Sequence, residues 1–117
     1  MKTNKKIILI DLDGVLNTYT GTYNEIIPPL KTGALEFLQL LSTKYKIKIF
    51  TSRNLLKTAR WIIDNNLINY IDDITNIKEP SYLLVDDRCI NFEGNYNEII
   101  EKISQFNPWY KNKYMSG

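Results

Sequence analysis

The sequence predicts an α/β domain with a doubly wound, Rossmann-like, mostly parallel sheet and helices on both faces. Two features of the chain lead to this fold class. Short apolar runs rich in β-branched residues alternate with segments in which apolar residues recur at helical spacing, and polar residues follow directly after the apolar runs. Alternating strands and helices build right-handed βαβ units around a parallel sheet. Ligands of such sheets bind beyond the carboxyl ends of the strands, where these polar residues are expected.

Three runs have the character of buried strands. Ile7 to Ile10 contains no polar residue, which is the pattern of a strand covered on both faces. Lys46 to Thr51 and Tyr82 to Asp86 are also predicted to be strands of the parallel sheet, and a fourth strand is expected near Asp73 to Ile77. Polar side chains that could share one site stand at or just after the ends of the three clear runs, namely Asp11, Asp13, Thr51, Ser52, Asp86 and Asp87.

The segments between and after these strands have helical periodicity. The last of them is the clearest, because Asn95 followed three residues later by Glu98 forms a capping-box pattern. Helices are predicted along the apolar lines Ala34, Phe37, Leu38, Leu41 and Tyr45; Leu56, Ala59, Ile63 and Leu67; and Tyr96, Ile99, Ile100, Ile103 and Phe106.

Composition limits the classes of protein that this chain can represent. With 117 residues and 44% hydrophobic content, we expect one domain over 1–117, with a core at about 5–106 and a tail at 107–117. The net charge of +2 is scattered, so nothing predicts a nucleic-acid groove or a membrane-binding face. No apolar run approaches the roughly 20 residues of a membrane span, and the single cysteine fits a reducing compartment, so we expect a cytoplasmic protein.

Acidic residues gather at two of the predicted strand ends. Asp11 and Asp13 are two residues apart, so both can face one pocket, and Gly14 permits a sharp turn after them. Asp86 and Asp87 follow another strand. Four converging aspartates would repel one another without a cation between them. The chain has no histidine, and oxygen ligands alone favour Mg²⁺, so we expect a magnesium site here.

These motifs resemble those of the haloacid dehalogenase-like phosphohydrolases. The run from Asp11 to Leu16 looks like the first motif of that family, and the run from Ile49 to Ser52 looks like the second. Lys78 is placed like the lysine of the third motif, and the run from Leu83 to Asp87 looks like the acidic fourth motif. The four motifs occur in order and extend from Ile7 to about Gly94.

The resemblance implies a phosphatase that hydrolyses a phosphate monoester through an aspartyl-phosphate. In this mechanism Asp11 is the nucleophile, Asp13 is the acid and then the base, and Thr51 and Lys78 bind the transferring phosphoryl group. Mg²⁺ would be held by the Asp11 carboxylate, the Asp13 backbone carbonyl and Asp86, with Asp87 in direct or water-mediated support. Thr51 could instead simply end its strand. Ser52 and Arg53 are candidate substrate-binding residues, although Arg53 could also neutralise the aspartates.

The chain has no room for the cap domain of larger family members. Residues 17–30 suffice only for a flap, in which Tyr19 and Tyr23 could stack on a base or sugar. An uncovered site can accept a small molecule, a nucleotide or a macromolecular end as its phosphorylated substrate, or borrow a lid from a neighbouring subunit. The resemblance extends to small bacterial and phage members and, more loosely, to deoxyribonucleotidases, so a nucleotidase or a nucleic-acid-end phosphatase is an alternative.

Two hypotheses of another class remain open. A receiver-like phosphoacceptor also combines acids, a Thr or Ser and a Lys on a doubly wound sheet, but it carries its paired acids after the first strand and a single acid later. Here the first strand carries Asp11 and Asp13, and the pair comes last. A non-catalytic binding module is the other hypothesis, and the complete set of Asp11, Asp13, Thr51 and Lys78 argues against it.

Overall fold

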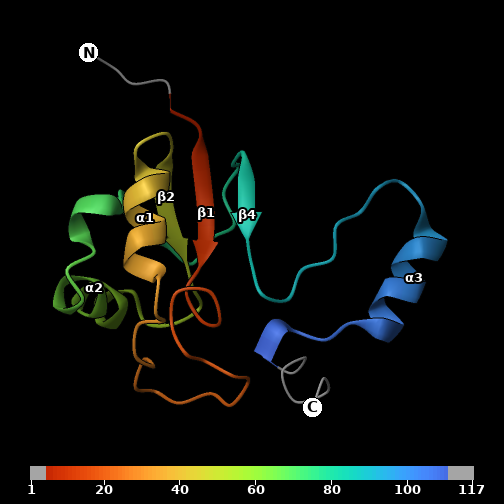
Figure 1. Cartoon of the computed structure of the whole chain (residues 1–117), viewed down its shortest axis with the longest axis horizontal. Coiled ribbons are helices and arrows are strands. Elements are labelled where there is room, and N and C mark those ends of the chain that lie inside the picture. Colours follow the sequence, from red (N-terminus) through yellow and green to blue (C-terminus); the bar gives the residue numbers. More distant parts are fainter. Residues whose placement is uncertain (1–4, 111–117) are drawn as a thin grey trace. The chain divides into compact units, whose positions relative to one another are not determined.

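The computed structural model describes residues 5–110 and places the predicted elements in the predicted order (Figure 1). One compact unit reaches to Asp86, and a second begins at Asp87. A single domain over 1–117 stays a prediction, and residues 111–117 of the expected tail lie outside the described part. The elements are β1 (Ile7–Asp11), α1 (Ala34–Ser42), β2 (Lys46–Phe50), α2 (Leu55–Asp64), the 3-10 helix η1 (Ile68–Tyr70), β3 (Asp73–Thr75), β4 (Leu83–Val85) and α3 (Tyr96–Gln105).

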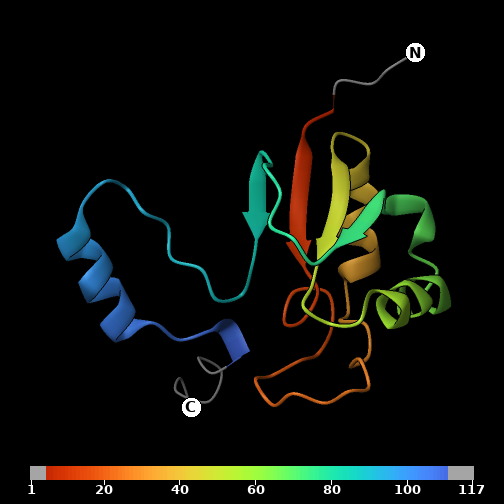
Figure 2. The same ribbon diagram turned by 180° about the vertical axis from the view of Figure 1, so that it is seen from behind.

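The sheet is entirely parallel and has the strand order β3-β2-β1-β4 (Figure 2). The strand β1 lies between β2 and β4, and its residues Ile8 to Ile10 are buried, as the apolar run predicted. This α/β architecture confirms the predicted fold class. Because neighbouring strands run in the same direction, the residues that follow β1, β2 and β4 emerge at one edge of the sheet.

The core of the first unit lies on one face of this sheet. Ile8 and Ile10 of β1 and Ile47 and Ile49 of β2 alternate with residues of the opposite face, and all four belong to one buried cluster. Each such side chain contributes about 2 kcal/mol through burial. Both α1 and α2 join the same cluster, through Ala34, Leu38, Trp61 and Ile62. Helices α1 and α2 therefore cover the same face of the sheet. The predicted helix on the opposite face stays a prediction.

The helix α2 turns a different side towards the core from the one that its apolar line indicated. Its buried residues are Thr58, Trp61 and Ile62, whereas Leu56 and Ile63 of the predicted line are 82% and 53% exposed. The indole N–H of Trp61 donates to the Pro28 carbonyl at 3.2 Å, which draws this side of the helix inwards. The predicted line was therefore wrong at Leu56 and Ile63, because apolar spacing gives no weight to Thr58 or to the indole donor. Leu67 of the same line lies beyond the helix and is fully buried, as predicted.

The two other helices also depart from their predicted apolar lines, and α3 has no buried residue, because Tyr96, Ile100 and Ile103 are 77%, 67% and 61% exposed. Helix α1 ends at Ser42, so Tyr45 of its predicted line lies beyond it. Helix α3 begins where the capping box indicated, because the Asn95 side chain accepts hydrogen bonds from the N–H groups of Asn97 and Glu98. Within residues 5–110, no helix is long and apolar enough to cross a membrane. The cytoplasmic location stays a prediction.

Candidate active site at the carboxyl edge of the sheet

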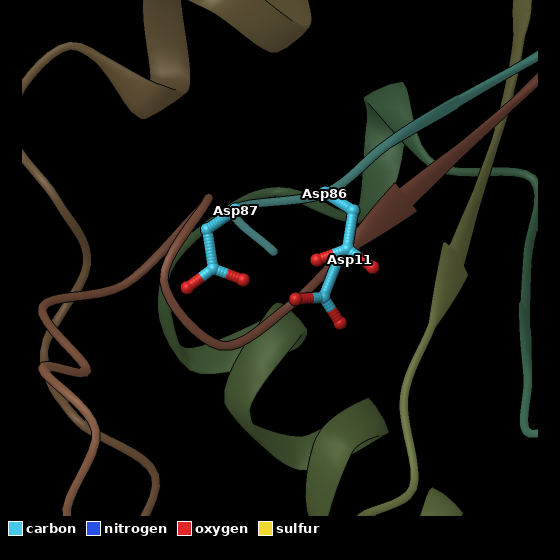
Figure 3. A group of neighbouring side chains, drawn as sticks. All are labelled: Asp11, Asp86 and Asp87. Atoms are coloured by element: carbon cyan, nitrogen blue, oxygen red, sulfur yellow. The ribbon is translucent and has the colours of Figure 1, made fainter. Parts of the chain in front are cut away.

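Three aspartates come together where β1 and β4 end (Figure 3). Ile10 of β1 pairs with Val85 of β4, so the next residues, Asp11 and Asp86, leave the sheet at the same level. Asp87 is the next residue along the chain, and each of the three carboxylates offers an oxygen within 4.8 Å of the others. All three side chains are partly buried. The convergence that the sequence predicted is therefore present for Asp11, Asp86 and Asp87.

The fourth predicted aspartate, Asp13, has different neighbours. Its side chain is 21% exposed, and its carboxylate accepts from the Arg53 Nε, which lies 2.8 Å from Oδ2 and 3.0 Å from Oδ1. The Asn17 side-chain amide donates to Oδ1 at 2.9 Å. These donors hold the Asp13 carboxylate in one orientation. Its side chain does not belong to the group of three aspartates.

The turn after β1 explains how Asp13 is held. Gly14 adopts a φ of 84°, which other residues rarely take, and its N–H donates to the Asn17 Oδ1 at 3.1 Å. Asn17 is fully buried, so both ends of its amide are used inside the turn. Asn17 is not among the site residues predicted from the sequence. The available signal was an asparagine shortly after a glycine, because Asn side chains commonly bond the backbone of their own turn.

Thr51 follows β2 and is almost fully buried. Its N–H donates to the Thr75 carbonyl at 3.0 Å, and its hydroxyl oxygen accepts the Arg53 N–H at 3.1 Å. The hydroxyl thus shapes the turn after the strand while its proton remains able to donate elsewhere. Ser52 is exposed. The phosphate-binding roles of Thr51 and Ser52 stay predictions.

Arg53 connects the acidic edge to the flap at residues 17–30. Its Nη1 donates to the backbone carbonyls of Asn24 and Glu25, at 2.6 and 3.5 Å, and its guanidinium lies 4.7 Å from the centre of the Tyr23 ring. The flap is closed at its base by an antiparallel bridge between Asn17 and Leu30. The guanidinium pairs with the Asp13 carboxylate, so Arg53 neutralises one aspartate, and its substrate-binding role stays a prediction.

Lys78 lies in the segment that crosses from β3 to β4. It is exposed, and it forms no hydrogen bond or ion pair with another of the residues 5–110. Its neighbour Glu79 is anchored instead, because the Lys48 ammonium of β2 donates to the Glu79 carboxylate at 3.0 Å. That hydrogen bond raises the pKa of Lys48 above its usual value of 10.5. The contact of Lys78 with a phosphoryl group stays a prediction.

Comparisons with known proteins support the fold. No family model and no curated protein sequence matches the chain. Among solved structures, a conserved protein from Bacteroides thetaiotaomicron superposes with a TM-score of 0.57 and 18% sequence identity, over 92% of this chain and 96% of that chain. At this identity the similarity is one of fold alone, and it agrees with the parallel α/β architecture described above.

Proposed function

We propose that this chain is a magnesium-dependent phosphatase of the haloacid dehalogenase-like type, which hydrolyses a phosphate monoester through an aspartyl-phosphate on Asp11. The observation that carries the proposal is the convergence of Asp11, Asp86 and Asp87 at the ends of two paired parallel strands. A surface group of three carboxylates this close is electrostatically unfavourable without a cation. Its position is also the place where ligands bind in sheets of this kind.

The donor set suits a hard divalent cation. Each carboxylate is partly buried and offers one oxygen within 4.8 Å of the others, and the chain contains no histidine to favour zinc. Asp11 and Asp86 would hold Mg²⁺, together with Asp87 and the Asp13 backbone carbonyl. When bound there, the ion would offset the negative charge of the carboxylates and of the phosphoryl oxygens.

The residues of this edge can divide the reaction between them. A carboxylate oxygen of Asp11 attacks the phosphorus in line, and the bond from phosphorus to the leaving oxygen breaks. The Asp13 carboxyl group protonates that leaving oxygen, then takes a proton from the water that attacks the aspartyl-phosphate and releases inorganic phosphate. Arg53 and Asn17 fix the Asp13 side chain beforehand, which lowers the entropy cost of both proton transfers. Thr51 and Lys78 would bind phosphoryl oxygens.

Substitution of the nucleophile is the decisive experiment. We expect Asp11→Asn to lower the rate of para-nitrophenyl phosphate hydrolysis in Mg²⁺ by about 1000-fold or more, because the amide cannot form the phospho-enzyme. Asp64→Asn is the matched control, since Asp64 is exposed at the far end of α2, and it should retain the wild-type rate. Equal rates for wild type and Asp11→Asn would exclude Asp11 as the nucleophile.

The metal is tested by binding as well as by rate. We expect chelation with EDTA to abolish hydrolysis and Mg²⁺ to restore it. In calorimetric titrations, Asp86→Asn should weaken Mg²⁺ binding by about tenfold or more, because one anionic ligand is lost. Asp64→Asn should bind Mg²⁺ as the wild type does. Hydrolysis that continues unchanged in EDTA would contradict the magnesium dependence.

A further inference from the structure

A pocket of about 180 Å³ lies between the flap and the beginning of α2. Arg53 forms part of its wall, and the same guanidinium pairs with Asp13 at 2.8 Å. The pocket is therefore one side chain away from the proposed acid and base. Its lining consists of Tyr23, Glu25, Ile27, Arg53, Asn54 and Lys57.

The first turn of α2 gives this pocket a positive end. Asn54 caps the helix, and its side chain accepts the Lys57 N–H at 3.0 Å. The N–H groups at the start of a helix carry partial positive charge and bind anions readily. Here the turn contains Lys57 and no acidic residue. A cation at this end of a helix is unfavourable without a negative partner, so the wall favours an anionic ligand.

Arg53 provides an independent observation that points to a ligand. Its side chain is 3% exposed, and its Nε and Nη1 donate to Asp13 and to the flap. Its Nη2 is also buried, yet it has no acceptor among residues 5–110. A buried donor without an acceptor costs about 1–3 kcal/mol. Tyr23 covers the guanidinium from the flap, and because it is 64% exposed it has room to turn aside when a ligand enters.

The chemistry of the lining favours phosphate. Arg53 and Lys57 supply cationic donors to the wall and Glu25 supplies its one carboxylate, while the charge of Arg53 is shared with Asp13 outside the pocket. A phosphate group offers several charged oxygens at once, so it can accept from a guanidinium and an ammonium together, within the positive field at the start of α2.

We propose that this pocket binds a second phosphate group of the substrate, one that the enzyme does not transfer. The inference rests on the proposed function, because it assigns the pocket to the leaving-group side of the same reaction. It makes the preferred substrate a phosphate monoester whose leaving group carries another phosphate. Binding energy from that second group would then position the transferred one.

Selectivity between paired substrates tests the proposal. The assay compares kcat/KM for alkanediol bisphosphates of two to four carbons with that for the matching alkyl monophosphates. We expect the wild type to prefer at least one bisphosphate, and Lys57→Gln to lower this preference by about tenfold, because a charged hydrogen bond is lost. Arg60→Gln is the control, because it removes the same charge from an exposed position of α2, and it should keep the preference for the bisphosphate. Glu25→Gln should increase this preference, because it removes the carboxylate of the pocket wall.

A binding measurement separates failure of this proposal from failure of the proposed function. Inorganic phosphate is titrated into Asp11→Asn protein, and the backbone amide resonances of residues 53–57 are followed by NMR. Saturable shifts that Lys57→Gln weakens support the pocket. Unmoved resonances, or a wild-type preference near one for every chain length, overturn it even when para-nitrophenyl phosphate is hydrolysed. Absence of any magnesium-dependent hydrolysis instead overturns the proposed function, and with it the assignment of this pocket to a substrate.

Discussion

The turn after β1 and the segment that crosses from β3 to β4 both carry a residue of the proposed mechanism, but they hold it in different ways. Asp13 in the turn is fixed by Arg53 and by the fully buried Asn17. Lys78 in the crossing segment is exposed, although both of its neighbours are anchored, Glu79 by Lys48 and Ile77 by the Thr75 hydroxyl. The acid is thus preorganised, whereas the cation is free to approach a phosphoryl group when one binds. The difference predicts that substitution of Arg53, which holds Asp13, alters both stability and rate, and that substitution of Lys78 alters rate alone.

The largest effect is expected from the loss of the acid and base. We expect Asp13→Asn to lower turnover by about 10²- to 10⁴-fold, because proton transfer to and from the reacting oxygens is lost. Calorimetric Mg²⁺ binding should persist, since the Asp13 side chain is not part of the group of three carboxylates. Circular dichroism checks that the variant is folded. A folded variant with unchanged turnover would rule out this role.

Removal of the guanidinium tests the preorganised turn directly. We expect Arg53→Met to lower the free energy of unfolding by about 3 kcal/mol, because it leaves the partly buried Asp13 carboxylate without its charged partner. Urea denaturation measures this change. Arg60→Met, on an exposed position of α2, should change stability by less than about 0.5 kcal/mol. A similar small change for both variants would show that the ion pair contributes little.

Substitution of Lys78 in the crossing segment should lower the rate and leave the stability unchanged. We expect Lys78→Met to reduce kcat by about 100-fold, because one cationic contact to the transferring group is lost. Its stability should stay within about 0.5 kcal/mol of the wild type, since the side chain is exposed. Steady-state kinetics and urea denaturation on one preparation give both values. A large loss of stability would remove the contrast between the two regions.

The smallest effect concerns the anchor of the crossing segment. In a double-mutant cycle, the free energies of unfolding of Lys48→Met, Glu79→Gln and the double variant are measured by urea denaturation. They should give a coupling energy of about 0.5–1 kcal/mol between the two side chains. The hydrogen bond to Glu79 raises the pKa of Lys48 in the folded state, so the coupling is complete at neutral pH and is lost as the pH rises above 10.5. Lys46→Met on the same strand is the control and should show no such dependence. A coupling that stays constant up to pH 12 would contradict this assignment.

The sequence was sufficient for the strands and for three of the aspartates. The apolar run from Ile7 to Ile10 identified β1, and the rule that parallel strands end at one edge brought Asp11 towards Asp86. The sequence allowed Arg53 to neutralise the aspartates but could not select Asp13 as its partner, because the two residues are 40 positions apart and their contact depends on two turns. The buried face of α2 was also missed, since it depends on the indole of Trp61 reaching the Pro28 carbonyl.

The flap leaves and returns to the framework at almost the same place. Besides the bridge between Asn17 and Leu30, the Lys31 N–H donates to the Leu16 carbonyl at 2.8 Å and the Thr18 N–H to that of Pro29 at 3.0 Å. A loop whose ends are joined this closely can be lengthened or replaced at little cost in stability, because doubling its length costs only about 0.6 kcal/mol in closure entropy. A longer insert could thus be grafted between Thr18 and Pro29 without moving Asp11, provided that it supplies carbonyl acceptors for Arg53.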